Sequence, residues 1–566
     1  MTTPPIMGEG KVGAKTTLIA ARGRWLGYGY IQRGFLTRGE EMARSLRHLA
    51  QTTALVASAA LMLAACGSTS STAPSSTNKS TPLQMLTIGS SNVFPPTLNP
   101  TANASQAIDE VIDYNVLQHL VQLAPNGSIV PVLASSYTVS DANKVYTFTI
   151  RKGVTFSNGN PLTPADVVFS MKRVYAPGST YPYGKIFDVS SVEQVGSDQV
   201  RVTLTTPSWN WLYDLAAYSN GVILDPSTVS TLATDPIGTG PFKVTGEVSN
   251  YSVSLARNNQ YWGYKPHVSG VVFRYFSNAD SLNAALQSGE VNMIDNLSAP
   301  SDATLFKSNP KYKVVSSLTN GKVQMTLNNT YGPLSNKLVR QAILFATDRK
   351  AIMNAASGGY GLIDGTDTVP ADPYYINLAS EYPYNVTKAR KLMAEAGYSK
   401  GFSLQLVLPP YFYAKLAAPL LVSELGAIGI KVSVSTIDFP LWISQVFEGG
   451  DFQATIIDQA EGRDVSNYGT TGYYWHYAKT PEIASELTAA NAAPTKAQWI
   501  AGYQKVLKQI TADAVNDWLY IAPFITVIDK NIVGIPTSAY TESYNLSYVG
   551  IGGTIPTSAK QLGYLS

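Results

Sequence analysis

The chain of 566 residues contains one cysteine and four histidines. A single cysteine excludes an intramolecular disulfide framework and any cysteine-rich zinc or iron–sulfur site. Charged residues make up only 14% of the chain, against about 25% in a typical globular protein, and the net charge is only +3. This balance provides no concentrated basic face, so we expect no nucleic-acid partner.

Hydrophobic residues, by contrast, make up 45% of the chain. That fraction excludes disorder for most of the sequence and is sufficient for large cores. The length exceeds the roughly 250–300 residues at which a single core stops growing, which predicts more than one domain. His119, His267 and His476 are isolated in the sequence. We therefore expect neither a catalytic metal site nor a cofactor.

The one cysteine follows an uncharged stretch, Leu49–Ala65, which is preceded by Arg44 and Arg47. Its apolar part spans Ala54–Ala65 and is shorter than the ~20 residues of a membrane-spanning helix. A basic region, a short apolar region and small residues are typical of a secretory signal. Leu63-Ala64-Ala65-Cys66 resembles the lipobox of bacterial lipoproteins. The resemblance implies cleavage before Cys66 and diacylglycerol on its sulfur, although an ordinary signal with an incidental cysteine is the alternative.

Three N-terminal segments follow from this interpretation. We expect residues 42–65 to be the lipoprotein signal peptide and residues 66–81, rich in serine and threonine, to be a flexible tether. Residues 1–41 fit no signal, and we expect them to be a mis-assigned extension, with Met42 as the true start. Residues 1–65 hold eight basic and three acidic side chains, which leaves 33 basic and 35 acidic residues in 66–566. Such a sparsely charged surface suits an acidic habitat.

The remainder of the chain alternates predicted strands and helices. Residues 145–150, 200–204 and 271–276 have the β-branched or alternating pattern of strands. Asn385 is placed to cap a helix that runs to Ala396, and Gly397 suits a left-handed C-terminal residue. A second helix over 415–428 leads into a strand from Ile430. The sequence therefore predicts the α/β class.

Seven segments of the chain stand out by their order and spacing. The longest is residues 115–172. The other segments are Thr97-Leu98-Asn99-Pro100, Pro236–Phe242, Arg257–Trp262, Leu286–Val291, Val339–Arg349 and Ala394–Tyr398. Together they resemble the peptide/nickel-binding family of extracytoplasmic solute-binding proteins of ABC importers (solute-binding protein family 5), with the densest match in residues 115–172. Each motif alone is weak, but their order and spacing together are specific.

The resemblance implies a two-lobed periplasmic-binding-protein fold with an extra domain inserted in the first lobe. The first lobe should take residues 82–117, 225–325 and 527–566. The inserted domain should take 118–224, and the second lobe 326–526. Lobes of this kind close on hinges around a ligand.

The segment Asp458–Tyr477 is the best candidate for ligand contact because it lacks the apolar periodicity of a core element. Peptide-binding relatives place an acidic residue near here, which pairs with the α-ammonium group of the ligand. Asp464 aligns with the family's Asp-Pro position, but Val465 replaces the proline, so Glu461 is an equal contender. Arg463 could bind a ligand carboxylate. A solvated loop with local charge pairing is the alternative.

Aromatic residues supply the remaining candidates. Tyr413 follows the strand over 403–408, where an α/β fold often binds ligands, but it also suits the rim or the core. Trp442 matches an aromatic position of peptide-binding relatives, and Trp475 lies in the candidate segment. We expect Trp209 and Trp211 to pack within the inserted domain.

These features predict a substrate-binding lipoprotein that captures di- or oligopeptides and delivers them to ABC permease subunits. We expect an extracytoplasmic monomer held at the membrane by lipid. The same fold could instead bind an oligosaccharide, a nickel complex or another small solute. A rival of another class is a lipid-anchored hydrolase, since residues 397–401 match G-x-S-x-G. That motif requires a strand before it and a helix after it, and here the predicted order is inverted, so we expect no enzyme.

Overall fold

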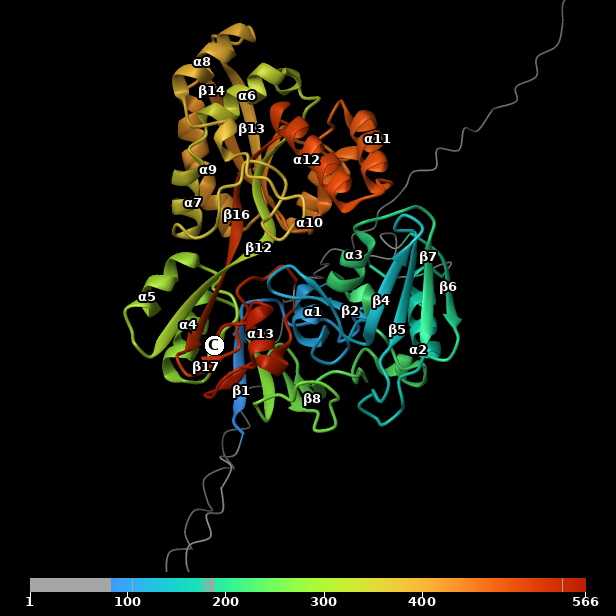
Figure 1. The fold of residues 1–566 in the computed structure, drawn as a ribbon. Helices are drawn as coiled ribbons and strands as arrows, with labels where there is room; N and C mark the ends of the chain where they lie inside the picture. The colour runs from blue at the N-terminus through green and yellow to red at the C-terminus, as the bar shows by residue number, and fades with distance from the viewer. Residues whose placement is uncertain (1–82, 104, 177–178, 180, 183–187, 542) are drawn as a thin grey trace, which may run out of the picture. The chain divides into compact units, whose positions relative to one another are not determined.

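The computed structural model describes residues 83–566, except 104, 177–178, 180, 183–187 and 542. The predictions for residues 1–41, 42–65 and 66–81, including lipidation of Cys66, lie outside the described residues. Within the described part, strands and helices alternate along the chain, as Figure 1 shows. The predicted α/β class is confirmed.

One sheet of ten strands connects most of the described residues, in the order β14-β13-β15-β12-β16-β11-β1-β10-β9-β8. Its centre consists of two long antiparallel strands, β12 (Tyr312–Leu327) and β16 (Asn516–Asp529), paired from Tyr312 opposite Asp529 to Thr326 opposite Asn516. Their pairing shifts register between Leu318 and Lys322. In Figure 1 the two strands run side by side from one group of elements to the other.

The half of the sheet beyond β16 is called the first lobe here. Its β1 pairs in parallel with β10, and its core contains Leu86, Ile88 and Phe273. Its strands are β1 (Met85–Ser90), β8 (Phe242–Val248), β9 (Ser252–Arg257), β10 (Gly270–Tyr275) and β11 (Met293–Ile294). Its other elements are α1 (Gln106–Ile112), α4 (Ala279–Ser288), α5 (Ala303–Lys307), β17 (Ile532–Val533), β18 (Gly550–Ile551) and α13 (Thr557–Gln561).

The half beyond β12 is called the second lobe. Its strands are β13 (Phe402–Leu408), β14 (Ile430–Thr436) and β15 (Ala454–Gln459). Its helices are α6 (Lys337–Ala346), α7 (Arg349–Ser357), α8 (Val386–Glu395), α9 (Phe412–Gly426), α10 (Phe439–Trp442), α11 (Thr480–Asn491) and α12 (Lys496–Ala512). Two apolar clusters form its cores.

Local sequence signals in the second lobe are confirmed. The Asn385 side chain accepts a hydrogen bond from the Lys388 N–H at the start of α8, and Gly397 after its end has φ +83°. Helix α9 leads into β14, which lies parallel to β13, so the predicted helix–strand unit is present. The G-x-S-x-G segment lies between the end of α8 and the start of β13. Its context is therefore the inverse of a nucleophile elbow.

A separate antiparallel sheet, in the order β4-β5-β7-β6, has its own core and is called the inserted domain. Its strands are β4 (Ala134–Ser140), β5 (Val145–Ile150), β6 (Val189–Val195) and β7 (Gln199–Leu204). Buried and half-buried residues alternate along β5 and β7, as predicted. Helices α2 (Pro164–Val174) and α3 (Trp211–Ala217) and the pair β2 (Val121–Leu123) and β3 (Ile129–Pro131) accompany this sheet.

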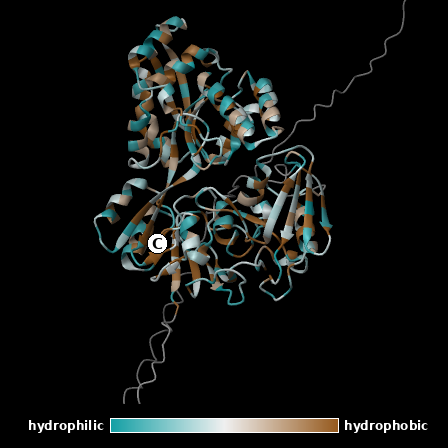
Figure 2. Ribbon diagram, viewed as in Figure 1, coloured by the Kyte–Doolittle hydropathy of each residue, from teal (hydrophilic) through white to brown (hydrophobic). Residues whose placement is uncertain are grey.

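Apolar residues are concentrated in the strands, whereas the helices alternate between apolar and polar residues (Figure 2). This distribution is what amphipathic helices packed on sheets require. Among the described residues, no helix combines the length and apolar character needed to cross a membrane.

Candidate functional site

The candidate site is a buried cluster of charges around the loop that follows β15. Lys322 contributes from β12, at the residue where pairing with β16 resumes after the register shift. Arg463 adopts left-handed backbone angles, φ 55° and ψ 34°, which are uncommon for a residue other than glycine. Strain of this kind is typical of functional loops. The cluster therefore combines a rigid strand with a strained turn.

Lys322 is the centre of the cluster. Its Nζ lies 2.6 Å from Asp464 Oδ1 and 3.5 Å from Asp367 Oδ1, and it donates a 2.8 Å hydrogen bond to the carbonyl of Glu461. All three charged side chains are at most 5% exposed. Burial alone would lower the pKa of Lys322, but the two carboxylates outweigh it and raise that pKa above its ordinary value. Burial and the Asp464 charge raise the pKa of Asp367 to about 7.

Arg463 connects the loop to the inserted domain. Its Nε lies 3.7 Å from Asp372 Oδ1, and both side chains are 5% exposed. Its Nη1 donates a 3.2 Å hydrogen bond to the Asn210 side-chain oxygen, and its guanidinium lies 3.9 Å from the centre of the Tyr213 ring. Burial raises the pKa of Asp372 despite the opposing effect of Arg463. Arg463 is therefore engaged by protein groups on several sides.

Asp458, at the end of β15, contributes a buried carboxyl oxygen. Its Oδ1 is inaccessible to solvent and has no hydrogen-bond partner among the described residues. Burial raises its pKa to about 6, against the lowering effect of Lys322. Gly321 is required beside it, because a β-carbon there would lie 2.4 Å from Asp458 Oδ1.

Glu461 differs from Arg463 and Asp464 in its exposure. It is half-buried, and its Oε2 accepts a 2.5 Å hydrogen bond from Gln459. The Gln459 amide also lies 3.4 Å from the hydroxyl of Tyr473. The structure thus brings Glu461, Arg463 and Asp464 together in one turn, with Arg463 and Asp464 committed to buried ion pairs.

Tyr413 and Trp442 contact residues of β15, and Trp442 and Trp475 lie in one aromatic cluster. The hydroxyl of Tyr413 accepts a 3.2 Å hydrogen bond from the Asp458 N–H. Trp475 is 1% exposed and stacks on Tyr468 with ring centres 4.4 Å apart. Trp442 is 3% exposed and donates a 2.9 Å hydrogen bond to Thr455. Both tryptophans belong to the second cluster of the second lobe's core.

One prediction about the inserted domain is wrong. Trp211 packs within that domain as expected, but Trp209 packs on the second lobe. Its ring stacks on Trp499 with centres 5.8 Å apart, and its Nε1 donates a 3.1 Å hydrogen bond to the carbonyl of Ala493. The reason is its position before the start of α3, where the chain leaves the four-stranded sheet.

Sequence reasoning missed the partners of the predicted charges. These are Lys322, Asp367, Asp372, Asn210 and Tyr213. The pattern gives no sign that Lys322 is buried, because Lys322 shares one face of an alternating strand segment with Gln324 and Thr326. The identity of those partners depends on the tertiary fold.

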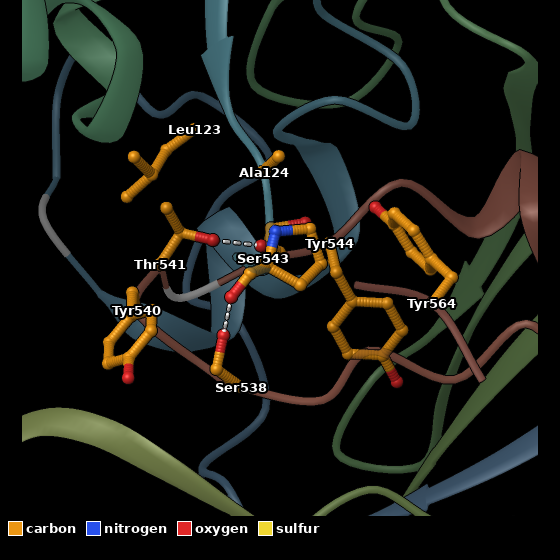
Figure 3. A pocket seen from close by; sticks show the side chains of 9 residues that line it. Leu123, Ala124, Ser538, Tyr540, Thr541, Ser543, Tyr544 and Tyr564 are labelled. Atoms are coloured by element: carbon orange, nitrogen blue, oxygen red, sulfur yellow. Dashed lines mark hydrogen bonds between the residues drawn. The ribbon is translucent and has the colours of Figure 1, made fainter. Parts of the chain in front are cut away.

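A small pocket lined in part by Tyr540 contrasts with this cluster (Figure 3). Its nine lining residues come from 123–125 and from 538–564 and include no charged side chain. Ser543 donates hydrogen bonds to nearby backbone carbonyls, and Thr541 donates to the carbonyl of Ser543. These hydroxyls serve internal hydrogen bonds, so the charge cluster remains the better candidate site.

Comparison with known proteins identifies the family. The family model described as bacterial extracellular solute-binding proteins, family 5 Middle, matches residues 128–506. Heme-binding protein A of Haemophilus influenzae is 29% identical over 439 residues, covering 70% of this chain and 79% of that protein. Di/tripeptide-binding protein 1 of Pseudomonas aeruginosa is 28% identical over 394 residues, covering 63% and 73%.

Solved structures agree in fold. The binding protein AgaA of A. tumefaciens R10, in complex with agropinic acid, has a TM-score of 0.69 and 26% identity, covering 83% of this chain and 99% of that one. The substrate-binding protein CtaP of Listeria monocytogenes has a TM-score of 0.74 and 22% identity, covering 84% and 100%. The predicted two-lobed α/β fold is thereby confirmed. The chain belongs to the bacterial extracellular solute-binding proteins of family 5.

Proposed function

We propose that this chain is the ligand-capturing component of an ABC importer and that its ligand is a short peptide. The observation that carries the proposal is the exposure of the Glu461 carboxylate, which is half-buried, whereas Arg463 and Asp464 in the same turn are buried. A carboxylate in that position can accept charge-assisted hydrogen bonds from a peptide α-ammonium group. The names of relatives that bind di- and tripeptides or glutathione support the same ligand class.

The roles of the other two charges follow from their partners. Asp464 neutralises Lys322 inside the protein, and Arg463 pairs with Asp372 and Asn210. Recruiting either of them to a ligand would break an existing buried pair, at a cost of several kcal/mol. We assign ammonium recognition to Glu461 because it is the most exposed of the three charges, and to Arg463 and Asp464 the task of holding its loop. Tyr413 supports the same loop through Asp458.

The proposal includes the wider organisation of the chain. The division into a first lobe (82–117, 225–325 and 527–566), an inserted domain (118–224) and a second lobe (326–526) places both predicted lobe boundaries within β12 and β16. β12 passes through the first boundary and β16 through the second, and the two paired strands would act as the hinge. Cys66 would hold a monomeric protein at the outer face of the membrane, next to the permease.

A screen of thermal stability tests the ligand class. A ligand at about 100 times its dissociation constant should add about 2.7 kcal/mol to the free energy of unfolding. We expect di- to pentapeptides to raise the melting temperature of the purified protein. Haem, oligosaccharides and nickel chelates should be screened in parallel, because one relative is named for haem binding. A shift with one of these and with no peptide would reject the peptide assignment.

The hydrolase alternative is tested with the same samples. A binding protein returns its peptide unchanged, whereas a hydrolase releases fragments. Chromatography of each stabilising peptide after incubation should recover only the intact compound. Fragments that disappear in the Ser399→Ala variant would establish the enzyme instead.

A further inference from the structure

The start of α3 makes a continuous series of contacts with the second lobe. In addition to the Trp209 contacts with Trp499 and Ala493, the Asn210 side chain donates a 3.2 Å hydrogen bond to the hydroxyl of Tyr503. Its oxygen accepts from Arg463 at 3.2 Å. One turn later, the Tyr213 ring lies against the Arg463 guanidinium. These contacts connect the inserted domain to α12 and to the 461–464 loop.

Helix α3 approaches the 461–464 loop most closely at Gly462, beside the hydroxyl of Tyr213. A β-carbon on Gly462 would lie 2.0 Å from the hydroxyl oxygen of Tyr213 and 2.8 Å from the Asn320 side-chain nitrogen. The hydroxyl of Tyr218 donates a 3.4 Å hydrogen bond to the Gly462 carbonyl. Tyr213 is only 3% exposed and has little room to move. The absence of a side chain at residue 462 is therefore what allows α3 to reach the loop.

We propose that Trp209, Asn210 and Tyr213 form a latch that holds the inserted domain against the second lobe. Its contacts are made to Trp499, Tyr503 and Arg463. The stacked indoles, the two amide hydrogen bonds and the cation–π contact each contribute to closure. This inference deepens the proposed function, because it concerns how the capture site closes.

The latch has a consequence for binding. A ligand that binds the closed form has an apparent dissociation constant equal to its intrinsic constant divided by the closed fraction. Opening the latch would therefore weaken the binding of every ligand by the same factor, whatever the chemistry of that ligand. A residue that contacts ligand would change affinities selectively.

The Gly462→Ala variant tests the latch without any ligand. The backbone of Gly462 is outside the left-handed region in which an alanine would be strained. Gly426→Ala is the matched control, since a β-carbon at Gly426 meets nothing within 4 Å. We expect Gly462→Ala to increase the radius of gyration of the ligand-free protein in small-angle scattering. We also expect hydrogen exchange across residues 209–213 to accelerate on the order of tenfold, with wild type and control unchanged.

A second variant keeps the test independent of folding defects. Asn210→Ala removes hydrogen bonds to Tyr503 and Arg463 at a half-buried position and adds no clash. Asn210→Ala should likewise increase the radius of gyration and accelerate hydrogen exchange across residues 209–213. Its thermal unfolding should remain cooperative. Identical scattering and exchange in wild type and both variants would overturn the latch. Because no ligand is present, that result is separate from a failure of the peptide assignment.

Discussion

Lys322 and Asp464 form a buried ion pair in which Nζ and Oδ1 lie 2.6 Å apart and the side chains are 3% and 5% exposed. Asp367 Oδ1 lies 3.5 Å from the same Nζ, and the Asp367 side chain is 1% exposed. Because two carboxylates share one buried cation, each of the three charges is compensated by the others. Removing one partner from such a cluster is far more damaging than removing a surface pair.

The Lys322→Met variant should therefore lose about 3–5 kcal/mol of unfolding free energy, because Asp464 and Asp367 would be left buried without a cation. Chemical denaturation measures the loss. Lys391→Met is the matched control, since Lys391 is 78% exposed and its pair with Glu395 is 3.7 Å long. That control should lose less than about 1 kcal/mol. Equal losses in the two variants would show that the cluster is not a structural unit.

Glu461→Gln should weaken binding of a free peptide on the order of tenfold or more, because a neutral amide oxygen accepts a hydrogen bond from an ammonium group but cannot form an ion pair with it. Titration calorimetry with a stabilising peptide and its N-acetylated form measures this effect. The acetylated peptide should bind weakly to wild type and should lose little further affinity in the variant.

Glu395→Gln, on the exposed surface of α8, is the control for Glu461. It should bind both peptide forms as wild type does. If Glu461→Gln also behaves as wild type, ammonium recognition belongs to another residue.

Stability should decrease as the pH rises from about 5 to 8. Burial raises the pKa of Glu424 to about 7, and the charges of Asp348 and Asp517 add to the effect, while the hydrogen bond from the Asp348 N–H and the charge of Arg349 oppose it. An acid whose pKa is higher in the folded state than in the unfolded state is stabilising below its unfolded pKa. That contribution is lost as the pH rises through the folded value. Burial raises the pKa of Asp214 to about 7 and of Asp364 to about 8, so these carboxyls act in the same direction.

Glu424→Gln isolates one of these groups. The amide oxygen can still accept the 3.2 Å hydrogen bond from the Asp348 N–H. Melting temperatures measured from pH 5 to pH 8 should fall less in the variant than in wild type. Equal slopes would contradict the buried, protonated carboxyl at this residue. The direction agrees with the acidic habitat expected from the sparse charge.

The strands and helices could be predicted where local signals suffice. The Asn385 cap and the left-handed Gly397 define α8 by short-range hydrogen bonding and backbone sterics alone. The motif Val339–Arg349 was useful for recognising the family, and the structure explains it physically. Arg340 donates to the carbonyls of Leu334, Asp513 and Ala514, which fixes α6 to the start of β16.

The candidate site was predictable only in part. The segment Asp458–Tyr477, which contains the loop 461–464, stood out because it lacks the apolar periodicity of a core element, but the partners of its charges are distant in sequence. Lys322 lies 142 residues from Asp464, and Asn210 lies 253 residues from Arg463. Trp209 shows the same limit, because an aromatic residue near one sheet gives no sign that it docks on another lobe. Long-range pairing of this kind is set by topology rather than by local pattern.

Lipidation is tested at the single cysteine. Cells fed radioactive palmitate should label the wild-type protein and not the Cys66→Ala variant, and that variant should appear uncleaved or in the soluble fraction. Mapping the translation start in the same strain tests Met42. Unlabelled wild-type protein, or export without cleavage at Cys66, would refute the anchor.

The central claim is that this protein captures a peptide in a closed, stoichiometric complex. Isothermal titration calorimetry of the purified full-length protein with the most stabilising di- to pentapeptide tests that claim most directly. We predict one peptide bound per chain, a negative heat-capacity change from surface buried on closure, and intact peptide recovered afterwards. Heat that reflects continuous turnover, or no saturable binding of any peptide while another solute saturates at one per chain, would contradict it.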